Sequence, residues 1–567
     1  MKRNTLTTAV LAGLTGMAGM VSVSNAVNVN PDGLGQVLMY PYYTARGGND
    51  TLISIVNTTD RGKAVKIRFL EALNSREVLD FNIYMSEWDV WVGAVTADPD
   101  GGGLLRTTDT TCTTPLVFDA NLPFGDVLPG GRLNGEVSFF NVQYAGSRTD
   151  DGPQGEERNA SGHIEFIEMG ELLPTPASAP AASSPSYVPW AAKHTGPAGD
   201  RKPNDCAYLV DLWRDPAPGA GDPGPGQPTH WNFDAPFGFN RVDGDGDVIV
   251  SGGLFGAASI INGLDGVMFS YNATALDGFW DNDTGNHTNP GSVFPSLAGG
   301  GERDSNVFVN GQLVQATWDD SIFAVNATIT FDQYMNEYNV QAGLGARSEW
   351  VVTFPTKRFH TDAEGPIGTR PPNDPIAPFT NTWHDTPAGL NFPCEAMAFT
   401  VWDREELTPT PETGGVEFSP RPDDDEPPIF ELCRETNVIR FSQGGGDLPA
   451  ETEILRESLR DGDFRKLGYS NFNLPSGFDA GWFRFDFGDI PTGASLASLV
   501  DPDIVATGQR VSEEPIVGNR VIGLPAIGFW VNTFQQSSLA DEPIRNYGGT
   551  FDHHGSRDIF TDTIIID

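Results

Sequence analysis

The run Asp243-Gly244-Asp245-Gly246-Asp247 has the residue types and spacing of a metal-binding loop. Aspartates at alternate positions, separated by glycines, let a loop curl until several carboxylates converge on one calcium ion. A complete EF-hand loop would carry an acidic residue at its twelfth position, where this chain has Leu254. The run therefore fits a calcium site, and it fits equally a Gly-Asp hairpin turn before the apolar run 248–250.

Four cysteines form an even set, which is typical of disulfide bonds in an exported chain. They are Cys112, Cys206, Cys394 and Cys433. Of the three ways to pair them, we favour Cys112 with Cys206 and Cys394 with Cys433, because each bond then closes a loop within one half of the chain. A zinc site is disfavoured, since no Cys-x-x-Cys occurs and no histidine lies within a few residues of any cysteine.

Other residue groups could support catalysis or sugar binding. The run Asp552-His553-His554-Gly555-Ser556 could offer imidazoles to a metal or a base to a nucleophile, but adjacent strand residues face opposite ways, so at most one histidine could serve a buried site. Glycoside hydrolysis needs two carboxylates, and no motif selects a pair from the 76 acidic residues. The tryptophans that could stack on sugars are Trp88, Trp91, Trp280 and Trp482, although strand tryptophans more often lie in the core.

The charge of the chain excludes one class of partner. The 35 lysines and arginines are outnumbered by 76 acidic residues, which gives a net charge of -41. A surface of this sign repels a polyanion, so we expect no nucleic-acid partner. The excess of acidic residues is compatible with a saline medium that screens repulsion, with divalent cations bound at the surface, or with simple solubility of an exported protein. No P-loop, His-Glu-x-x-His or Gly-x-Ser-x-Gly motif occurs, which favours a non-enzymatic role.

Residues 1–26 have the pattern of a secretory signal peptide. A basic start, Met1-Lys2-Arg3-Asn4, precedes the apolar run 5–23 and a small-x-small cleavage site at Ser24-Asn25-Ala26. The apolar run is interrupted by glycines and is short for a membrane-spanning helix, so cleavage is expected. We therefore predict an exported protein at the cell surface, in the extracellular medium or in the periplasm, without a transmembrane segment after cleavage.

Strands must position most of these residues. Val65, Ile67 and Phe69 alternate with Lys66 and Arg68, which predicts a strand with one face in a core and one in water. Similar or apolar runs that predict strands are 79–85, 89–95, 136–144, 163–168, 248–250, 267–271, 322–331, 350–354, 397–402, 438–441, 482–487 and 527–534. One helix is predicted, over residues 449–460, where apolar and acidic side chains separate onto two sides.

Short strands between turn signals predict a mostly β fold of antiparallel β-sandwich-like domains, with long Pro/Gly-rich loops and very little helix. Segments 174–189 and 215–228 are rich in Pro, Ala, Ser and Gly, as linkers are. The expected division is a signal peptide at 1–26, an N-terminal β-sandwich-like domain at 27–172, a linker or long loop at 173–235, and a β-rich region at 236–567 with room for two subdomains.

Several phrases along the chain resemble an uncharacterised family of exported proteobacterial cell-surface proteins. They are Leu52-Ile53-Ser54-Ile55-Val56-Asn57-Thr58, Val65 to Glu71 followed by Asn74 to Asn82, Gly162 to Gly170, and Glu349 to Lys357. The resemblance implies export and a surface habitat. It brings no catalytic residues that could be assigned to this chain.

The sequence as a whole predicts a non-enzymatic exported protein of the cell surface or extracellular matrix, structural or adhesive, with calcium as the one expected cofactor. Its expected partners are further copies of itself or components of the envelope. The alternative is a secreted hydrolase, or a binding module, that acts on polysaccharide. A structural layer protein should be abundant in the envelope fraction and released by chelator or low salt, whereas an enzyme should be scarce and soluble in the medium.

Overall fold

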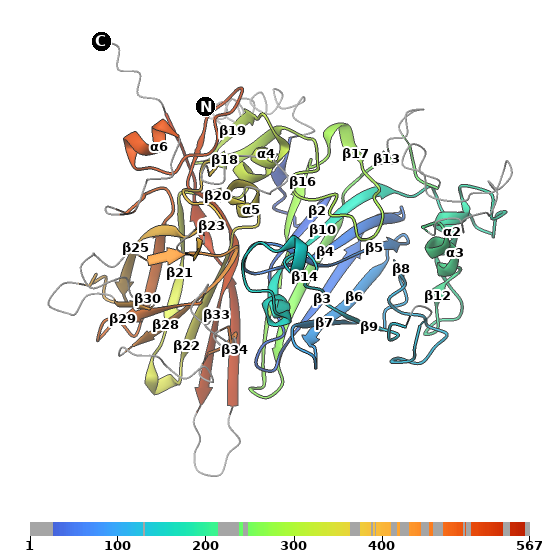
Figure 1. Ribbon diagram of the computed structural model, residues 1–567, viewed down its shortest axis with the longest axis horizontal. Coiled ribbons are helices and arrows are strands. Elements are labelled where there is room, and N and C mark those ends of the chain that lie inside the picture. The colour runs from blue at the N-terminus through green and yellow to red at the C-terminus, as the bar shows by residue number, and fades with distance from the viewer. Residues whose placement is uncertain are drawn as a thin grey trace, which may run out of the picture.

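Two β-sandwiches lie side by side in this chain, the first coloured blue to green and the second yellow to red (Figure 1). Their sheets are antiparallel except for one parallel strand pair in the second sandwich. The computed structural model describes residues 26–128, 131–213, 238–241, 248–362, 375–386, 389–391, 393–409, 417–419, 430–443, 453–457, 469–491, 494, 501–536 and 545–561. Of these described residues, 46% lie in strands and 10% in helices. These proportions confirm the predicted fold class.

The first sandwich consists of a seven-stranded sheet 1 and a six-stranded sheet 2. Sheet 1 has the order β1 (Asn28–Val29), β16 (Thr274–Asp277), β2 (Val37–Thr44), β10 (Ser161–Glu171), β4 (Lys63–Glu71), β5 (Glu77–Met85) and β8 (Cys112–Thr114). Sheet 2 has the order β15 (Val267–Asn272), β14 (Leu254–Asn262), β3 (Asn49–Asn57), β6 (Val90–Ala97), β7 (Gly103–Arg106) and β9 (Glu136–Ser138).

The two sheets of the first sandwich differ in what covers them. Val65, Ile67 and Phe69 of β4 enter the core between the sheets, as the alternation predicts. The outer side of sheet 2 is partly exposed, with alternate residues of β14 in solvent. Lys66 and Arg68 do not face water, however, because the chain around residue 289 covers this part of sheet 1 and Lys66 Nζ donates to Asn289 O at 2.8 Å. The prediction that the outer face of this strand is exposed to solvent is therefore wrong for β4.

The second sandwich also has two sheets around an aromatic core. Sheet 3 has the order β27 (Phe430–Leu432), β25 (Glu395–Asp403), β30 (Ala480–Asp486), β21 (Gln333–Asn339) and β35 (His554–Ser556). Sheet 4 has the order β26 (Glu417–Ser419), β29 (Tyr469–Leu474), β28 (Thr436–Gln443), β22 (Arg347–Thr353), β33 (Ile527–Gln536) and β34 (Arg545–Asp552). Between them, Trp350 meets Phe441 and Phe483 edge to face, at centroid distances of 5.5 and 5.2 Å.

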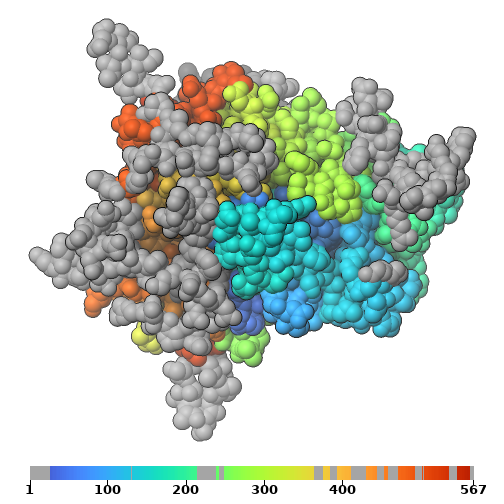
Figure 2. All heavy atoms as spheres, in the orientation of Figure 1, coloured from blue at the N-terminus to red at the C-terminus, as the bar shows by residue number. Residues whose placement is uncertain are grey.

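The sandwiches share a packed junction, so the central strands of sheet 4, β28 and β22, are buried on both faces. Val351, Val438 and Phe529 of sheet 4 point away from its own core and join the core cluster of the first sandwich. Phe529 stacks on Tyr271 at a centroid distance of 4.5 Å. Thr353 Oγ1 donates to Pro41 O at 2.6 Å. In the space-filling view, the cyan segment that carries η1 (Gly146–Arg148) and η2 (Glu156–Ala160) lies at the front, where the two halves meet (Figure 2).

The first sandwich extends beyond the predicted boundary at residue 172. Strands β14, β15 and β16 come from residues 254–277, yet β14 pairs with β3 and β16 pairs with β2. Part of the predicted linker is also folded. Helices α2 (Tyr187–Ala192) and α3 (Cys206–Asp211) and the hairpin β11 (His194–Thr195)/β12 (Lys202–Pro203) follow one another, and the two helices pack on Tyr84 and Leu172. A Pro/Ala/Ser-rich composition therefore does not mark a separate linker here.

The predicted strand at 322–331 is mostly a helix. Helix α4 (Ser321–Thr328) begins where the Asp320 side chain accepts from Ile322 N at 3.2 Å. All its residues are buried, and an apolar run of this kind cannot be assigned to helix or strand by periodicity. With the hairpin β18 (Asp304–Val309)/β19 (Gln312–Thr317), α4 packs against Met39 and Ile167 of sheet 1.

Shorter elements complete the described part. They are β13 (Val248–Ile249), β17 (Thr284–Gly285), η3 (Asp281–Asp283), β20 (Thr330–Phe331), η4 (Ala342–Leu344), α5 (Lys357–Thr361), β23 (His384–Thr386), β24 (Gly389–Asn391), α6 (Pro502–Thr507), β31 (Val521–Ile522), β32 (Leu524–Pro525) and β36 (Asp558–Ile559).

The predicted helix at 449–460 is wrong over residues 453–457, the part that the structure describes. This segment contains bends and a turn, and Arg456 has φ of 61°. The Glu349 carboxylate accepts from Ile454 N at 2.7 Å and from Leu455 N at 2.9 Å, and Ile454 and Leu455 enter the core of the first sandwich. Tertiary contacts at the junction therefore override the helical pattern.

Replacement of Leu455 tests how much this segment stabilises the junction. Leu455→Ala should lower the free energy of unfolding by about 2–5 kcal/mol, because the side chain is fully buried. Leu264→Ala is the matched control, since Leu264 is 88% exposed and its loss should cost less than about 0.5 kcal/mol. Urea titration followed by tryptophan fluorescence measures both. Equal small effects would mean that residues 453–457 do not hold the two sandwiches together.

Candidate functional site

Both predicted disulfide bonds are present. Cys112–Cys206 connects β8 to α3, and Cys394–Cys433 connects residues beside β25 and β27. The Glu431 carboxylate lies close to Cys394 and Cys433, but the disulfide occupies both sulfurs, so this group holds no thiolate for a metal. Two disulfides are typical of a protein that folds in an oxidising compartment outside the cytoplasm.

The predicted calcium ligands Asp243, Asp245 and Asp247 lie outside the described residues, so calcium binding stays a prediction. The similar run that begins at Asp281 forms η3. Asn282 and Asp283 adopt positive φ there, as Asn and Asp often do in tight turns.

The histidines near residue 553 and the singled-out tryptophans divide into core and surface residues. His553 Nε2 donates to Val351 O at 3.0 Å, and burial lowers the pKa of His553 to about 3, so this imidazole is neutral. His554 is exposed on the opposite side, as the strand geometry predicts. Trp91 and Trp280 are buried, whereas Trp88 and Trp482 are exposed.

An open groove of about 340 Å³ lies at one edge of the second sandwich, and we name it the aromatic groove. It is lined by Met335, Asn336, Glu337, Trp482, Trp530, Asn532, Phe551 and His554. Trp482, on β30, is 37% exposed and Phe551, on β34, is 52% exposed, so two ring faces reach solvent. The groove thus joins residues of sheets 3 and 4.

Neighbouring side chains hold the rings of the aromatic groove in place. Trp482 stacks on Trp402 with centroids 3.9 Å apart and planes 6° apart, and the Arg484 guanidinium lies over Trp402. Phe551 stacks on Trp530 at 5.1 Å. Rings that are already oriented lose little side-chain entropy when a ligand binds. Amide, carboxylate and imidazole groups of Asn336, Asn532, Glu337 and His554 supply hydrogen-bonding positions beside them.

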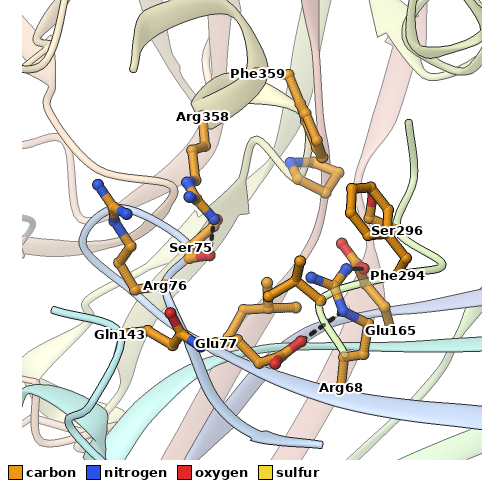
Figure 3. A pocket seen from close by; sticks show the side chains of 13 residues that line it. Arg68, Ser75, Arg76, Glu77, Gln143, Glu165, Phe294, Ser296, Arg358 and Phe359 are labelled. Atoms are coloured by element: carbon orange, nitrogen blue, oxygen red, sulfur yellow. Dashed lines mark hydrogen bonds and ion pairs between the residues drawn. The ribbon is translucent and has the colours of Figure 1, made fainter. Parts of the chain in front are cut away.

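A second cavity, of about 220 Å³, lies where the two sandwiches meet, and we name it the arginine pocket (Figure 3). Its lining residues are Arg68, Leu70, Ser75, Arg76, Glu77, Gln143, Glu165, Val293, Phe294, Ser296, Pro355, Arg358 and Phe359. Arg68 and Glu165 come from β4 and β10 of the first sandwich, and Arg358 comes from α5. Guanidinium groups therefore meet here from segments far apart in the sequence.

The arginines of this pocket differ in how well they are paired. Arg68 Nε donates to Glu77 at 2.8 Å, and its Nη1 donates to Glu165. Arg76 Nη2 donates to Asp362 at 2.8 Å. Arg358 makes only long contacts, with Asp362 and Ser75 O, both at 3.4 Å. Burial and then the charges of Arg76 and Arg68 lower the pKa of Arg358, although Asp362 acts in the opposite direction.

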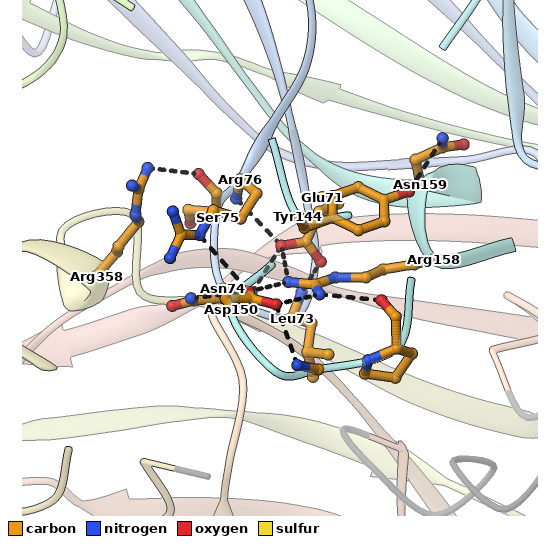
Figure 4. A network of polar contacts seen from close by, with 12 residues as sticks. Glu71, Leu73, Asn74, Ser75, Arg76, Tyr144, Asp150, Arg158, Asn159 and Arg358 are labelled. Carbon is orange, nitrogen blue, oxygen red and sulfur yellow. Dashed lines mark hydrogen bonds and ion pairs between the residues drawn. The ribbon is translucent and has the colours of Figure 1, made fainter. Parts of the chain in front are cut away.

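A buried ion network fixes the β4–β5 turn beside this pocket (Figure 4). The Glu71 carboxylate accepts from the backbone N–H groups of Leu73, Asn74 and Arg76 at 2.7, 2.9 and 3.1 Å. Arg158 Nη2 bonds Glu71 at 2.9 Å and Asp150 at 2.6 Å. Burial acts to raise the pKa of Glu71, but Arg158 and the N–H donors outweigh it, so the pKa lies below its usual value.

Two buried groups near the junction have displaced pKa values. Burial raises the pKa of Glu435 to about 8, and the nearby Lys357 and Arg358 offset only part of this effect. Burial likewise lowers the pKa of Lys357 to about 8. Lys357 Nζ donates to Leu432 O at 3.2 Å, and it lies 5.6 Å from the ring centroid of Phe354.

One further arrangement resembles a serine nucleophile with a lysine base. Lys63 Nζ donates to Ser251 Oγ at 2.9 Å and to Glu168 at 2.7 Å, and Ser251 Oγ in turn donates to Glu171. A neighbouring carboxylate stabilises the charged form of a lysine. Lys63 and Glu168 are both fully buried and bond each other directly, so we interpret this group as a structural ion pair.

The sequence gives only weak signals for these two sites. Trp482 was a candidate from its exposed strand position, but its partners Phe551 and Asn532 come from other strands more than 45 positions away. The period-two pattern places Lys66 and Arg68 on the polar face of a strand, and nothing in the neighbouring sequence indicates that loops cover them. Pairing between distant segments creates both sites.

A change at Glu435 should make stability depend differently on pH. Between the unfolded pKa of about 4.3 and the folded value near 8, the native protein holds a proton that the unfolded chain releases, so stability from this group falls as pH rises. Glu435→Gln removes that decline and should gain about 1 kcal/mol or more relative to wild type between pH 5 and pH 8, measured by urea unfolding. Glu514→Gln, at an exposed position, should give no pH-dependent difference. Parallel pH profiles for wild type and Glu435→Gln would contradict the prediction.

Comparisons with known proteins identify no relative of this chain: no family model, curated protein or solved structure matches it. Among the described residues, no helix is long and apolar enough to span a membrane.

Proposed function

We propose that this chain is an exported, non-enzymatic adhesive protein of the cell surface or extracellular matrix, and that its aromatic groove binds polysaccharide. The observation that carries the proposal is the pair of exposed rings, Trp482 and Phe551, set beside polar side chains in one open groove. A sugar ring has an apolar face and a rim of hydroxyl groups. It therefore matches a surface that combines stacked aromatic rings with amides and a carboxylate.

Several features support export. Residues 1–26 have the three parts of a signal peptide, and both disulfides require an oxidising environment to persist. The net charge of -41 keeps such a protein dispersed at low salt, and screening by salt or divalent ions would allow copies to approach one another or the envelope. Self-association under these conditions is part of the proposal.

Binding fits the groove better than hydrolysis does. Hydrolysis of a glycosidic bond uses two carboxyl groups on either side of the bond. Among the residues that line the aromatic groove, Glu337 alone carries a carboxylate. Glu77 and Glu165 do line one cavity, the arginine pocket, but both are bound by the same guanidinium of Arg68 and are almost fully buried.

Affinity electrophoresis in gels that contain a neutral glucan, a xylan or a galactan tests the groove. Wild type should be retarded by at least one of them, and Trp482→Ala should weaken that binding by about tenfold or more, because the variant loses a preoriented ring. Trp88→Ala is the matched control, since Trp88 is 64% exposed and lies on the first sandwich. Identical retardation of wild type and Trp482→Ala in all three gels would refute the assignment.

The hydrolase alternative has its own measurement. Incubation of wild type with the same three polysaccharides should release no reducing ends. If wild type releases reducing ends and Glu77→Gln or Glu165→Gln does not, the enzymatic proposal would replace the adhesive one. Circular dichroism would check that each variant is folded.

Calcium is the proposed ligand of the run at 243–247. Millimolar calcium should raise Tm, because carboxylates at Asp243, Asp245 and Asp247 repel one another until a cation binds between them. Changing all three to Asn should abolish the rise. A triple change of the exposed residues Asp60, Asp100 and Asp126 to Asn alters the net charge equally and should preserve it. An equal rise in both triple variants would assign the effect to general charge screening.

A further inference from the structure

The arginine pocket contains polar atoms that the protein leaves without partners. Ser296 and Arg76 are lining residues, and both side chains are more than nine-tenths buried. Ser296 Oγ has no hydrogen-bond partner among the described residues, and Arg76 Nε makes no hydrogen bond there beyond a long ion pair with Asp150. Arg76 Nε comes no closer than 3.5 Å to Asp150. Buried polar atoms are nearly always satisfied in folded proteins, so unpartnered ones at a cavity wall point to a ligand or to water.

Arg358 is the arginine of this pocket whose contacts with the protein are the longest, at 3.4 Å against 2.8 Å for Arg76 with Asp362 and for Arg68 with Glu77. A guanidinium has five N–H donors, and Arg358 uses two of them in contacts of 3.4 Å. Figure 3 shows its side chain reaching down from α5 towards the space that Arg68, Gln143 and Phe294 surround. Arg68, by contrast, already binds both Glu77 and Glu165. An added anion would therefore meet its strongest attraction at Arg358.

The carboxylates of the pocket limit the charge that a ligand can carry. Glu77 and Glu165 would repel a dianion such as phosphate, whereas a single carboxylate could pair with Arg358 in the bidentate geometry that guanidinium groups favour. The opposite wall is apolar, because Phe294, Val293 and Phe359 line it. The volume of about 220 Å³ is below the range of drug-sized ligands, which begins near about 300 Å³.

We infer that the arginine pocket binds a small monocarboxylate that carries hydroxyl groups and one apolar face, of the size of a single sugar acid. Its carboxylate pairs with Arg358, its hydroxyl groups meet Ser296 and Gln143, and its apolar face lies on Phe294. Phe294 is 48% exposed at the mouth, so the ligand can enter from solvent. Because the walls come from sheet 1, the segment 293–296 and α5, the bound ligand also contacts three parts of the chain that are far apart in sequence. This site is separate from the aromatic groove and does not depend on the function proposed for it.

Saturation-transfer NMR and calorimetry with D-glucuronate test the inference on the full-length protein. Wild type should bind D-glucuronate and should bind D-glucose, which lacks the carboxylate, at least about tenfold more weakly. Inorganic sulfate should compete only weakly, since it offers a second charge and no apolar face. Absence of D-glucuronate binding, or equal affinity for D-glucose or sulfate, would overturn the assignment.

Variants locate the site. Arg358→Gln should weaken D-glucuronate binding by about tenfold to a hundredfold, whereas Arg106→Gln, at an exposed arginine of the same chain, should leave it unchanged. If Arg358→Gln fails to fold, Phe294→Ala tests the apolar wall from an exposed position and should also weaken binding. Trp482→Ala should keep full affinity for D-glucuronate. This variant therefore tests the arginine pocket independently of polysaccharide binding at the aromatic groove. Unchanged affinity in Arg358→Gln or Phe294→Ala would overturn the inference.

Discussion

Covering both faces of a sheet forces its charged side chains to find partners inside the protein. This constraint governs sheet 1, where Lys63, Lys66 and Arg68 of β4 lie under other parts of the chain and pair with Glu168, Asp80, Glu77 and Glu165. An unpaired charge at these positions would cost several kcal/mol, so each cation requires an anion on a neighbouring strand. The same requirement fixes the β4–β5 turn through Glu71 and Arg158. The arginine pocket exists because the paired residues leave a gap where the two sandwiches meet.

These ion pairs also shape the outside of the molecule. Lys63, Lys66, Arg68, Arg158, Lys357 and Arg510 are all buried, in a chain that has only 35 basic residues. Fewer cations remain to offset the carboxylates in solvent, and the surface is more uniformly acidic than composition alone indicates. A neutral glycan suits the aromatic groove for this reason, because an anionic polymer would approach against repulsion. The arginine pocket is the local exception, where guanidinium groups gather at a cavity wall.

The sequence predicted those features that depend on local periodicity and failed where distant segments meet. Alternation correctly placed Val65, Ile67 and Phe69 in a core, and the spacing of the cysteines gave both disulfides. Periodicity missed α4, because a fully apolar run has no period. Periodicity also predicted a helix over residues 453–457, which does not form because the Glu349 carboxylate accepts hydrogen bonds from two backbone N–H groups there. The boundary at residue 172 came from composition, which says nothing about strands that return to an earlier sheet. Of the aromatic groove, Trp482 and His554 were identified in advance as candidates, and nothing in the sequence indicated that they would line the same groove.

The return of β14, β15 and β16 to the first sandwich has a consequence for the order of events during synthesis. Strand β3 lacks its neighbour β14 until residues 254–262 have left the ribosome, and β1 cannot join sheet 1 until β16 supplies the strand between it and β2. Long-range pairing of this kind folds slowly, and an open strand edge invites contact with other chains. A polypeptide that cannot close its first core early remains extended for longer, and only an extended chain can thread through a narrow translocation channel. Until β14 arrives, the backbone N–H and C=O groups along that side of β3 have no strand to pair with.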